Sequence, residues 1–255
     1  MIDIKKAEEE FKRYSSGYDM NESHIERKVR HTFRVEELCE KIAFSIGMNE
    51  EEINLAKLIG LLHDIARFEQ YTIYKTYDDH KSIDHGNFGV KILEEKNNIR
   101  EYIETDKYDN IILKAVEYHN KYSIGEDVNE EEELFCKIIR DADKLDIMYE
   151  ATCEFWKNEE KIIQKQELNS KVVEQFISKE VIDNRNSTQS IDKIIRIIAF
   201  IFDLNFKESF KIIKDNNYID KIIYRFDYEL EKTKNQMEKV RNIANKYINN
   251  KLEEE

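Results

Sequence analysis

The sequence predicts an all-α protein. Its 255 residues include no Pro and only 6 Gly, whereas Lys, Glu, Ile and Asn are abundant. This composition is typical of helices joined by short polar turns. Apolar residues also recur every three or four positions along most of the chain, which is the periodicity of an amphipathic helix. The chain is long enough for one large domain or two small ones, each with a sizeable core.

The first long helix is predicted over 21–46, where apolar positions follow helical spacing. Gly47 ends this helix, and Asn49 followed by three Glu is typical of the cap and first turn of the next one. The second helix is strongly apolar and ends on the pair His63-Asp64. Burying an imidazole and a carboxylate without partners is costly, so this pair needs water or a bound ion.

The stretch 67–84 is less regular and contains Thr, Tyr and Asp, so we expect a loop over the functional site there. Helical patterns return over 82–95, 108–122 and 131–156. Aromatic residues of the expected loop would either stack on a nucleobase or simply pack, namely Phe68, Tyr71, Tyr74 and Tyr77.

The C-terminal region differs because it contains no His and its apolar positions simply follow helical periodicity. We expect a buried helix over 191–202, a loop over 183–188 and a long helix over 217–252. The sequence therefore predicts a functional domain over 20–155. The C-terminal helical region, over 156–255, would pack on this domain or join copies of the chain into a homo-oligomer.

Charge and hydropathy restrict the partners. The formal net charge of -13 argues against binding a nucleic-acid polymer, because no basic stripe offsets the repulsion from phosphates. A small anionic substrate is compatible with this charge if a metal ion and local Arg or Lys residues receive it. No apolar run approaches the roughly 20 residues of a membrane span, and the N-terminus leads into acidic residues. We expect a soluble cytoplasmic protein without a membrane partner.

The cysteines do not predict a disulfide framework or a thiolate metal site. They are odd in number, scattered and not in CxxC spacing. We therefore interpret them as reduced thiols of the core, at Cys39, Cys136 and Cys153.

Histidines on apolar helix faces predict a metal site. Residues three or four apart share one face of a helix, and three of the six His share a face with apolar neighbours: His31, His85 and His119. With the pair His63-Asp64, four such His are unlikely to be independent core residues. His24 and His80 lie in polar surroundings and are expected on the surface.

A cluster of three Asp in the helix over 131–156 offers a further ligand. The acids stand among apolar residues, so at least one should face the interior and need a partner. Asp141 and Asp143 lie roughly 200° apart around a helix, so periodicity does not choose between them.

Taken in chain order, these residues resemble the HD superfamily of metal-dependent phosphohydrolases, which is named for its His-Asp doublet. The doublet after Leu-Leu, with an upstream His and a downstream Ala-Asp-Lys-Leu, carries the resemblance over roughly residues 20–150. The matching segments are 31–35, 61–67, 84–86 and 141–146. The resemblance implies an HD-domain helical bundle with a C-terminal helical extension.

The resemblance also implies a ligand set, in which His31, His63, Asp64 and Asp143 hold a divalent metal ion. His85 and His119 then complete a second metal position or contact the phosphate. Imidazole and carboxylate ligands without thiolate suit Mn, Fe, Co, Ni or Mg better than structural zinc. One ion is expected, and the ligand set has room for two. Asp141 would be a surface acid or would orient a ligand His.

The implied reaction is hydrolysis of a phosphate ester by metal-activated water. The resemblance implies that Asp64 and Arg67 are the catalytic residues. Family members often carry a basic residue near the site at the position of Arg67. A guanidinium there pairs bidentately with phosphate oxygens. Arg34 and Lys144 are weaker candidates for binding the substrate.

Three functions remain open at this point. The first is a phosphohydrolase acting on a nucleotide or another small phosphate ester. The second is a di-iron oxygenase, because relatives with the same fold use the same six positions to activate oxygen. The third is a non-catalytic module that senses a metal or a nucleotide. The sequence contains neither GxGxxG nor GKT, so it does not identify the substrate.

Overall fold

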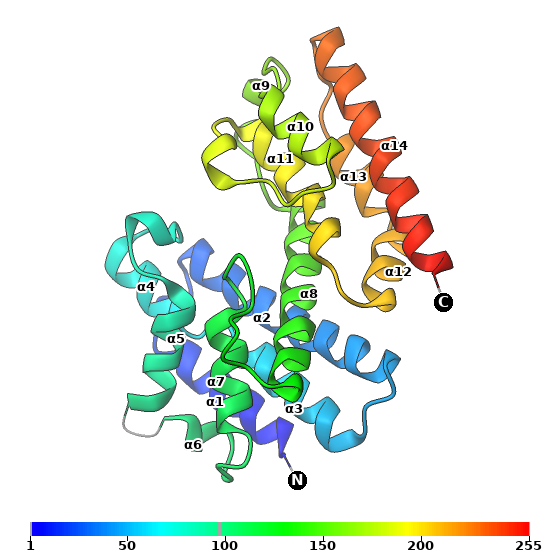
Figure 1. Ribbon diagram of the computed structural model, residues 1–255. Helices are drawn as coiled ribbons and strands as arrows, with labels where there is room; N and C mark the ends of the chain where they lie inside the picture. Colours follow the sequence, from blue (N-terminus) through cyan, green and yellow to red (C-terminus); the bar gives the residue numbers. More distant parts are fainter. Residues whose placement is uncertain (1, 96–97, 255) are drawn as a thin grey trace. The chain divides into compact units, whose positions relative to one another are not determined.

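The computed structural model describes residues 2–95 and 98–254 of the chain (Figure 1). Over these residues the regular elements are helices and there is no strand, which confirms the prediction of an all-α fold. The chain divides into two compact units, Met1–Asp143 and Lys144–Glu255, and each is considered by itself. No helix in the described part of the chain is long and apolar enough to cross a membrane.

The first unit is a helical bundle in which α2 packs along α3 and α5 packs along α7. The longer helices supply the core, and the two short elements η1 and α6 stand between them. The helices are α1 (Ile4–Ser15), α2 (Ser23–Ser45), α3 (Glu50–Leu62), α4 (Ala66–Tyr74), η1 (Asp79–Lys81), α5 (His85–Glu94), α6 (Ile99–Tyr102), α7 (Asp109–Tyr118) and the first part of α8 (Glu130–Cys153).

The start of α3 agrees with the predicted cap. The Asn49 side chain accepts a hydrogen bond from the Glu52 amide at 3.1 Å, and the Glu52 carboxylate accepts one from the Asn49 amide at 2.7 Å. This reciprocal arrangement satisfies two amides that have no partner within the helix and stabilises the helix by about 1 kcal/mol. It fixes where α3 begins, and thirteen residues later the helix ends directly before His63.

Two glycines allow the paired helices to approach closely. A Cβ atom at Gly60 would lie 2.9 Å from the Glu36 Cα, so α3 can pack this near to α2 only without a side chain there. A Cβ atom at Gly86 would lie 2.7 Å from the Glu117 carbonyl oxygen, which gives the same result for α5 and α7. These contacts bring together the helices that carry the predicted metal ligands.

The predicted loop over 67–84 is wrong in its first half, where α4 (Ala66–Tyr74) is helical. Phe68 on α4 is fully buried and its ring packs at 5.7 Å from that of Phe11 and 5.5 Å from that of Tyr18. The helix is therefore stabilised by packing against α1, which periodicity within a short polar segment does not reveal.

The second unit consists of shorter helices and one long C-terminal helix. The predicted helix over 191–202 is α11 followed by a 3-10 turn, and the segment around 183–188 is irregular except for one short turn. The elements of this unit are α9 (Glu160–Ile163), α10 (Ser170–Ile177), η3 (Asn184–Asn186), α11 (Ser190–Ile198), η4 (Ala199–Asp203), α12 (Lys207–Asp215), α13 (Tyr218–Ile223) and α14 (Glu231–Glu253).

The single long helix predicted over 217–252 is wrong, because α13 and α14 are separate helices. Between them the chain buries the rings of Phe226 and Tyr228. The Glu229 amide donates a hydrogen bond to the Gln164 carbonyl oxygen at 2.9 Å, which holds the segment against another part of the same unit. The break contains neither Gly nor Pro, so the sequence offered no local signal for it.

The cysteines agree with the prediction in two cases of three. Cys39 and Cys136 are buried free thiols, whereas Cys153 is exposed, so its assignment to the core is wrong. Cys153 is the last residue of α8.

Candidate metal centre

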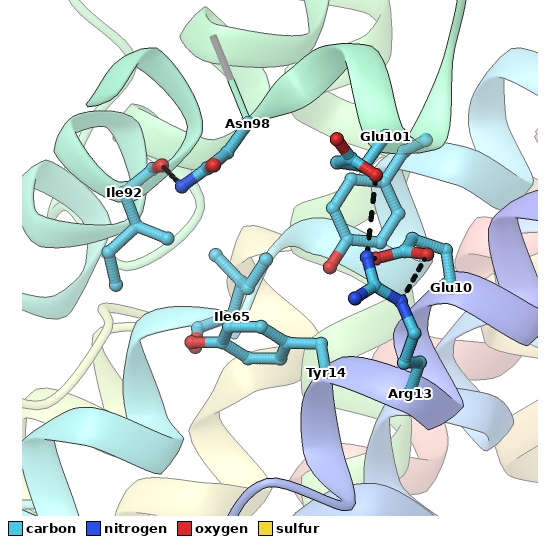
Figure 2. Close-up of a pocket in the computed structure, with 8 residues that line it drawn as sticks. Glu10, Arg13, Tyr14, Ile65, Ile92, Asn98 and Glu101 are labelled. Carbon is cyan, nitrogen blue, oxygen red and sulfur yellow. Dashed lines mark hydrogen bonds and ion pairs between the residues drawn. The ribbon is translucent and has the colours of Figure 1, made fainter. Parts of the chain in front are cut away.

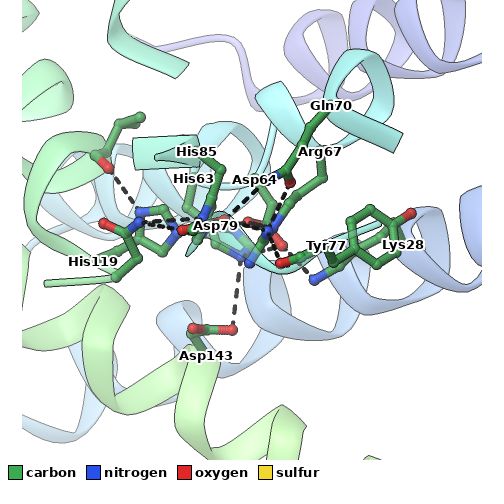
Figure 3. A network of polar contacts seen from close by, with 12 residues as sticks. Lys28, His63, Asp64, Arg67, Gln70, Tyr77, Asp79, His85, His119 and Asp143 are labelled. Atoms are coloured by element: carbon green, nitrogen blue, oxygen red, sulfur yellow. Dashed lines mark hydrogen bonds and ion pairs between the residues drawn. The ribbon is translucent and has the colours of Figure 1, made fainter. Parts of the chain in front are cut away.

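The structure brings the predicted metal ligands of the first unit into one cluster (Figure 3). The four His are nearly inaccessible to solvent, with at most 6% of any side chain exposed. They come from four helices: His31 from α2, His63 directly after α3, His85 from the start of α5 and His119 directly after α7. The other two His, His24 and His80, are exposed as predicted.

Asp64 lies at the middle of this cluster, and each of its carboxylate oxygens faces a different pair of His. Oδ2 is 3.4 Å from Nε2 of His31 and 3.5 Å from Nε2 of His63. Oδ1 is 3.4 Å from Nε2 of His85 and 3.5 Å from Nε2 of His119. One carboxylate is thus shared between two groups of ring nitrogens.

Asp143 on α8 adds a second carboxylate on the Oδ2 side. Its Oδ1 is 3.2 Å from Nε2 of His31 and 3.9 Å from Nε2 of His63, and Figure 3 shows it approaching the imidazoles from a separate helix. Burial raises the pKa of this carboxyl, but the hydrogen bond and charge of His31 outweigh burial and hold the pKa below its usual range. Asp141 is fully buried, so the alternative that places it on the surface is wrong.

Main-chain and carboxylate acceptors fix the protons of three of these rings. Nδ1 of His63 is 2.7 Å from the Gly60 carbonyl oxygen, and Nδ1 of His119 is 2.7 Å from the Val116 carbonyl oxygen. A carbonyl oxygen can only accept, so each Nδ1 must carry the proton and each Nε2 keeps a lone pair. The same reasoning applies to His85, whose Nδ1 donates to a carboxylate described below. The lone pairs therefore point at Asp64 and at one another.

This arrangement fits a bound cation. Nε2 of His85 and Nε2 of His119 are 3.0 Å apart, and both carry lone pairs, so neither can donate a hydrogen bond to the other. Burial lowers the pKa of His63 to about 3 and that of His85 to about 4, so these rings are neutral at neutral pH. Neutral imidazoles around a carboxylate, with no thiolate, are ligands for a divalent metal ion.

The ligand atoms form two groups that share Asp64. In each group the donor atoms lie within 4.8 Å of one another. The first consists of His31, His63 and Asp64, and the second consists of Asp64, His85 and His119.

Asp79 joins the cluster although the sequence did not predict it. Its Oδ2 lies 2.5 Å from Nδ1 of His85, and its Oδ1 accepts hydrogen bonds from Arg67 at 3.0 Å and from Gln70 at 2.9 Å. Burial raises the pKa of Asp79, but the hydrogen bond from His85 and further donors lower it below its usual range. Asp79 therefore holds an imidazole and a guanidinium at the same time. It precedes His80 in a segment without periodicity, so no sequence signal distinguished it.

Arg67 lies at the site as predicted. Its Nε is 3.3 Å from Oδ1 of Asp64, and its Nη1 donates to Gln70, to the Tyr77 carbonyl oxygen and to Asp79. Nη2 takes part in none of these bonds. The guanidinium is therefore fixed in orientation and still has a donor to offer.

Lys28 is a further residue that was not predicted from the sequence. Its Nζ is 2.6 Å from Oδ2 of Asp64. Lys28 precedes His31 by one helical turn on α2, so the spacing that identified His31 would also have placed Lys28 near the site.

The contacts described above do not test the two weaker candidates for substrate binding. Arg34 is half-buried on α2, one turn after His31. Lys144 belongs to the second unit, where its ammonium lies 2.9 Å from the Asp203 carboxylate. The roles of Arg34 and Lys144 in binding a substrate stay predictions.

A pocket of about 230 Å³ lies elsewhere in the first unit and is lined mainly by α1 and α6 (Figure 2). Arg13 pairs there with Glu10 and, at 3.3 Å, with Glu101. The Tyr14 hydroxyl donates to the carbonyl oxygen of Ile65, the residue after Asp64, at 3.1 Å. Among the described residues that line this pocket, none is a predicted metal ligand. The cluster around Asp64 is therefore the candidate functional site.

The fold and the site define an all-helical protein with a shared His-Asp cluster suited to divalent metal. Residues 29–148 match the family model of the HD domain. This part of the chain, which holds the cluster, is therefore an HD domain, and proteins with this domain are largely metal-dependent hydrolases. Comparisons with curated proteins and with solved structures gave no significant match.

Proposed function

We propose that this protein is a metal-dependent phosphohydrolase that cleaves a small phosphate ester, with nucleotides among the candidate substrates. The observation that carries the proposal is the position of Asp64 between two pairs of imidazoles. Three of these rings, those of His63, His85 and His119, have their Nε2 lone pairs free to face it. The match of residues 29–148 to the family model of the HD domain supports the same conclusion.

In this proposal one divalent ion is held by His31, His63, Asp64 and Asp143. His85 and His119 offer a second position that shares Asp64. A divalent ion at such a site lowers the pKa of bound water and polarises a phosphoryl oxygen. The donor set favours Mn, Fe, Co, Ni or Mg over structural zinc.

The chain's own residues would orient the substrate. Arg67 is held by Asp64, Asp79 and Gln70, so its guanidinium is fixed before any ligand binds. A fixed guanidinium binds phosphate oxygens at a smaller entropic cost than a mobile one. Asp79 would keep His85 in the tautomer whose Nε2 points into the site.

A second candidate function is a di-iron oxygenase. The observation that favours it is the same shared carboxylate, because a carboxylate between two sets of His is suited to two ions. The two functions differ in their need for oxygen. Hydrolysis proceeds in its absence, whereas an oxygenase loses its activity.

The experiment is metal analysis of the purified protein followed by a screen for phosphate release. The screen covers nucleotides and sugar phosphates, with and without added Mn²⁺, in air and under anaerobic conditions. We expect metal-dependent release of phosphate that persists without oxygen. Asp64→Ala should abolish it, whereas the matched control Asp215→Ala, an exposed acid of the second unit, should not. Activity that depends on oxygen would favour the oxygenase, and a protein that retains no metal would contradict both functions.

A further inference from the structure

Lys28 and Arg67 form a pair of cations on the two oxygens of Asp64. Nζ of Lys28 is 2.6 Å from Oδ2, and Nε of Arg67 is 3.3 Å from Oδ1. We propose that Lys28 is a second substrate-binding cation, which pairs with Asp64 without an ion and binds a phosphoryl oxygen once an ion occupies the Oδ2 side. This inference rests on the proposed metal-dependent phosphohydrolase function.

Both cations also lie against the ring of one aromatic residue. Nζ of Lys28 is 5.5 Å and the guanidinium carbon of Arg67 is 5.4 Å from the centre of the Tyr77 ring. A cation over an aromatic face is attracted by the ring even when it loses another partner. Tyr77 itself is held by a hydrogen bond from its hydroxyl to the His24 carbonyl oxygen at 2.9 Å. The ring therefore provides a place where Lys28 can remain after it leaves Asp64.

The two cations are more accessible to solvent than Asp64 and the imidazoles around it. The Lys28 side chain is 14% exposed and that of Arg67 is 13% exposed, whereas Asp64 is 3% exposed and His63 is inaccessible. In Figure 3, Lys28 and Tyr77 lie together on one side of Asp64, and His85 and His119 lie on the other. An anion that approaches from solvent on the side of Tyr77 would meet these two cations before it reached Asp64 or His63.

The ammonium of Lys28 competes with an ion for the same oxygen. Oδ2 of Asp64, its hydrogen-bond partner, is the oxygen that faces His31 and His63. A divalent ion bound there repels an ammonium at 2.6 Å from that oxygen. The ammonium is a compact charge on a flexible stem with three donors, so it can turn from the carboxylate to a phosphate oxygen.

This proposal predicts opposite effects of one substitution on two ligands. In Lys28→Met the competing charge is removed, so Mn²⁺ should bind more tightly, by roughly fivefold. Inorganic phosphate should bind the Mn²⁺-loaded protein more weakly, by about tenfold or more, because a charge-assisted hydrogen bond is lost. If Lys28 had only a structural role, its replacement would instead weaken the binding of both Mn²⁺ and phosphate, because less of the protein would be folded.

In the experiment Mn²⁺ is titrated into the full chain, and the free ion is measured by its paramagnetic resonance signal. Inorganic phosphate is then titrated into the Mn²⁺-loaded protein, and its binding is measured by calorimetry. Lys57→Met is the matched control, because Lys57 is similarly buried and pairs with Glu36 and Glu40 away from the cluster. We expect the control to change thermal stability and to leave both affinities as in the wild type. Lys28→Arg should restore much of the phosphate binding.

Unchanged phosphate binding by a folded Lys28→Met variant would overturn the inference while leaving the metal site intact. A fall in Mn²⁺ affinity in that variant would overturn it as well. If Lys28→Met does not fold, Lys28→Gln provides a neutral polar replacement for the same two titrations. Failure of the wild type to bind Mn²⁺ would instead refute the proposed function on which the inference rests.

Discussion

The two sides of the Asp64 carboxylate each present a pair of imidazoles, but their other partners differ. On the Oδ2 side a second carboxylate, that of Asp143, points at the same ring nitrogens as Asp64. On the Oδ1 side the additional acid is Asp79, which is turned to the far nitrogen of His85 and to Arg67. One side therefore has an additional carboxylate as a candidate ligand, and the other has an acid that orients its neighbours.

Because of this difference, we expect the two sides of the Asp64 carboxylate to have different roles. Two carboxylates and two imidazoles should hold a divalent ion more firmly than one carboxylate and two imidazoles, because each anion adds charge attraction. The Oδ1 side, with its fixed guanidinium, should contribute more to binding phosphate. Substitutions on the two sides should separate metal retention from substrate binding.

The largest effect is expected for Asp64→Ala, because Asp64 belongs to both sides. The substitution removes the shared ligand and leaves Lys28 and Arg67 without their common partner. We expect loss of metal retention and of hydrolysis, by about a thousandfold or more in rate. Metal analysis and phosphate release measure these effects. Full metal content and turnover in the variant would show that the ligand set is assigned wrongly.

The Oδ2 side is tested by comparing two neighbouring acids of α8. Asp143→Asn keeps the size of the side chain and removes its charge, so metal affinity should fall by about a hundredfold. Asp141→Asn should lower the metal affinity by about tenfold or less, because residues that only orient a metal ligand have smaller effects than the ligand itself. A metal titration gives both values. The reverse ranking would move the ligand role from Asp143 to Asp141.

The Oδ1 side is tested by His119→Ala. One ion should still bind through His31, His63 and Asp143, while activity falls because a second metal position or a phosphate contact is lost. The number of ions bound per chain and the rate of hydrolysis give the two readouts. If the variant lost every ion, the two sides would not be separable.

A smaller effect is expected for Asp79→Asn, which weakens the contacts to His85 and Arg67 without removing a proposed metal ligand. We expect kcat/KM to fall by about tenfold, with metal affinity on the Oδ2 side unchanged. Steady-state kinetics beside a metal titration would show this split. Equal losses in both measurements would place Asp79 among the groups that bind the ion.

The smallest effect is expected in the pH dependence of stability of the ion-free protein. The pKa values of His63 and His85 fall from 6.5 to about 3 and about 4 in the folded protein, so the unfolded chain binds more protons at low pH. The contribution of the two neutral His to the free energy of unfolding is full above pH 6.5. It is lost as the pH falls from 6.5 toward the folded-state pKa values of about 3 and about 4. Burial raises the pKa of Glu36 to about 7, which acts in the opposite direction.

Urea unfolding at a series of pH values from 7.5 down isolates the histidine contribution when His85→Gln is compared with the wild type. We expect the variant to lose less stability on acidification. The matched control His80→Gln replaces an exposed ring and should follow the wild-type curve. Parallel curves for wild type and His85→Gln would contradict the lowered pKa of His85.

Much of this fold follows from periodicity, and the failures have identifiable causes. The helix predicted over 21–46 is α2 (Ser23–Ser45), and the predicted cap at Asn49 starts α3. Helix α4 was missed because Phe68 is stabilised by residues of α1, which a local pattern does not contain. The break before α14 was missed for the same reason, since Phe226 and its neighbours are held by distant contacts.

The candidate site shows the same limit. The four buried His could be predicted because each one interrupts an apolar helix face or follows a buried helix, and a polar residue in such a position is conspicuous. Asp79 and Gln70 could not be predicted, because their partners are close in space only after α4 folds. Helical spacing places Lys28 on the same face as His31, but it does not show that the charge turns inward, because a lysine on such a face usually extends its charge to solvent.

The carbonyl groups that orient two of the imidazoles are those of Gly60 and Val116, in the last turns of α3 and α7. Such carbonyls exist whatever side chains surround them, because helix ends leave them without amide partners. The directions of two ring nitrogens of the proposed metal site are therefore set by the backbone, and substitutions at Lys28, Arg67 or Asp79 should leave them in place. If the proposed function is right, a centre built in this way can acquire different substrates during evolution through changes at Lys28, Arg67 and Asp79, while the four imidazoles keep their positions.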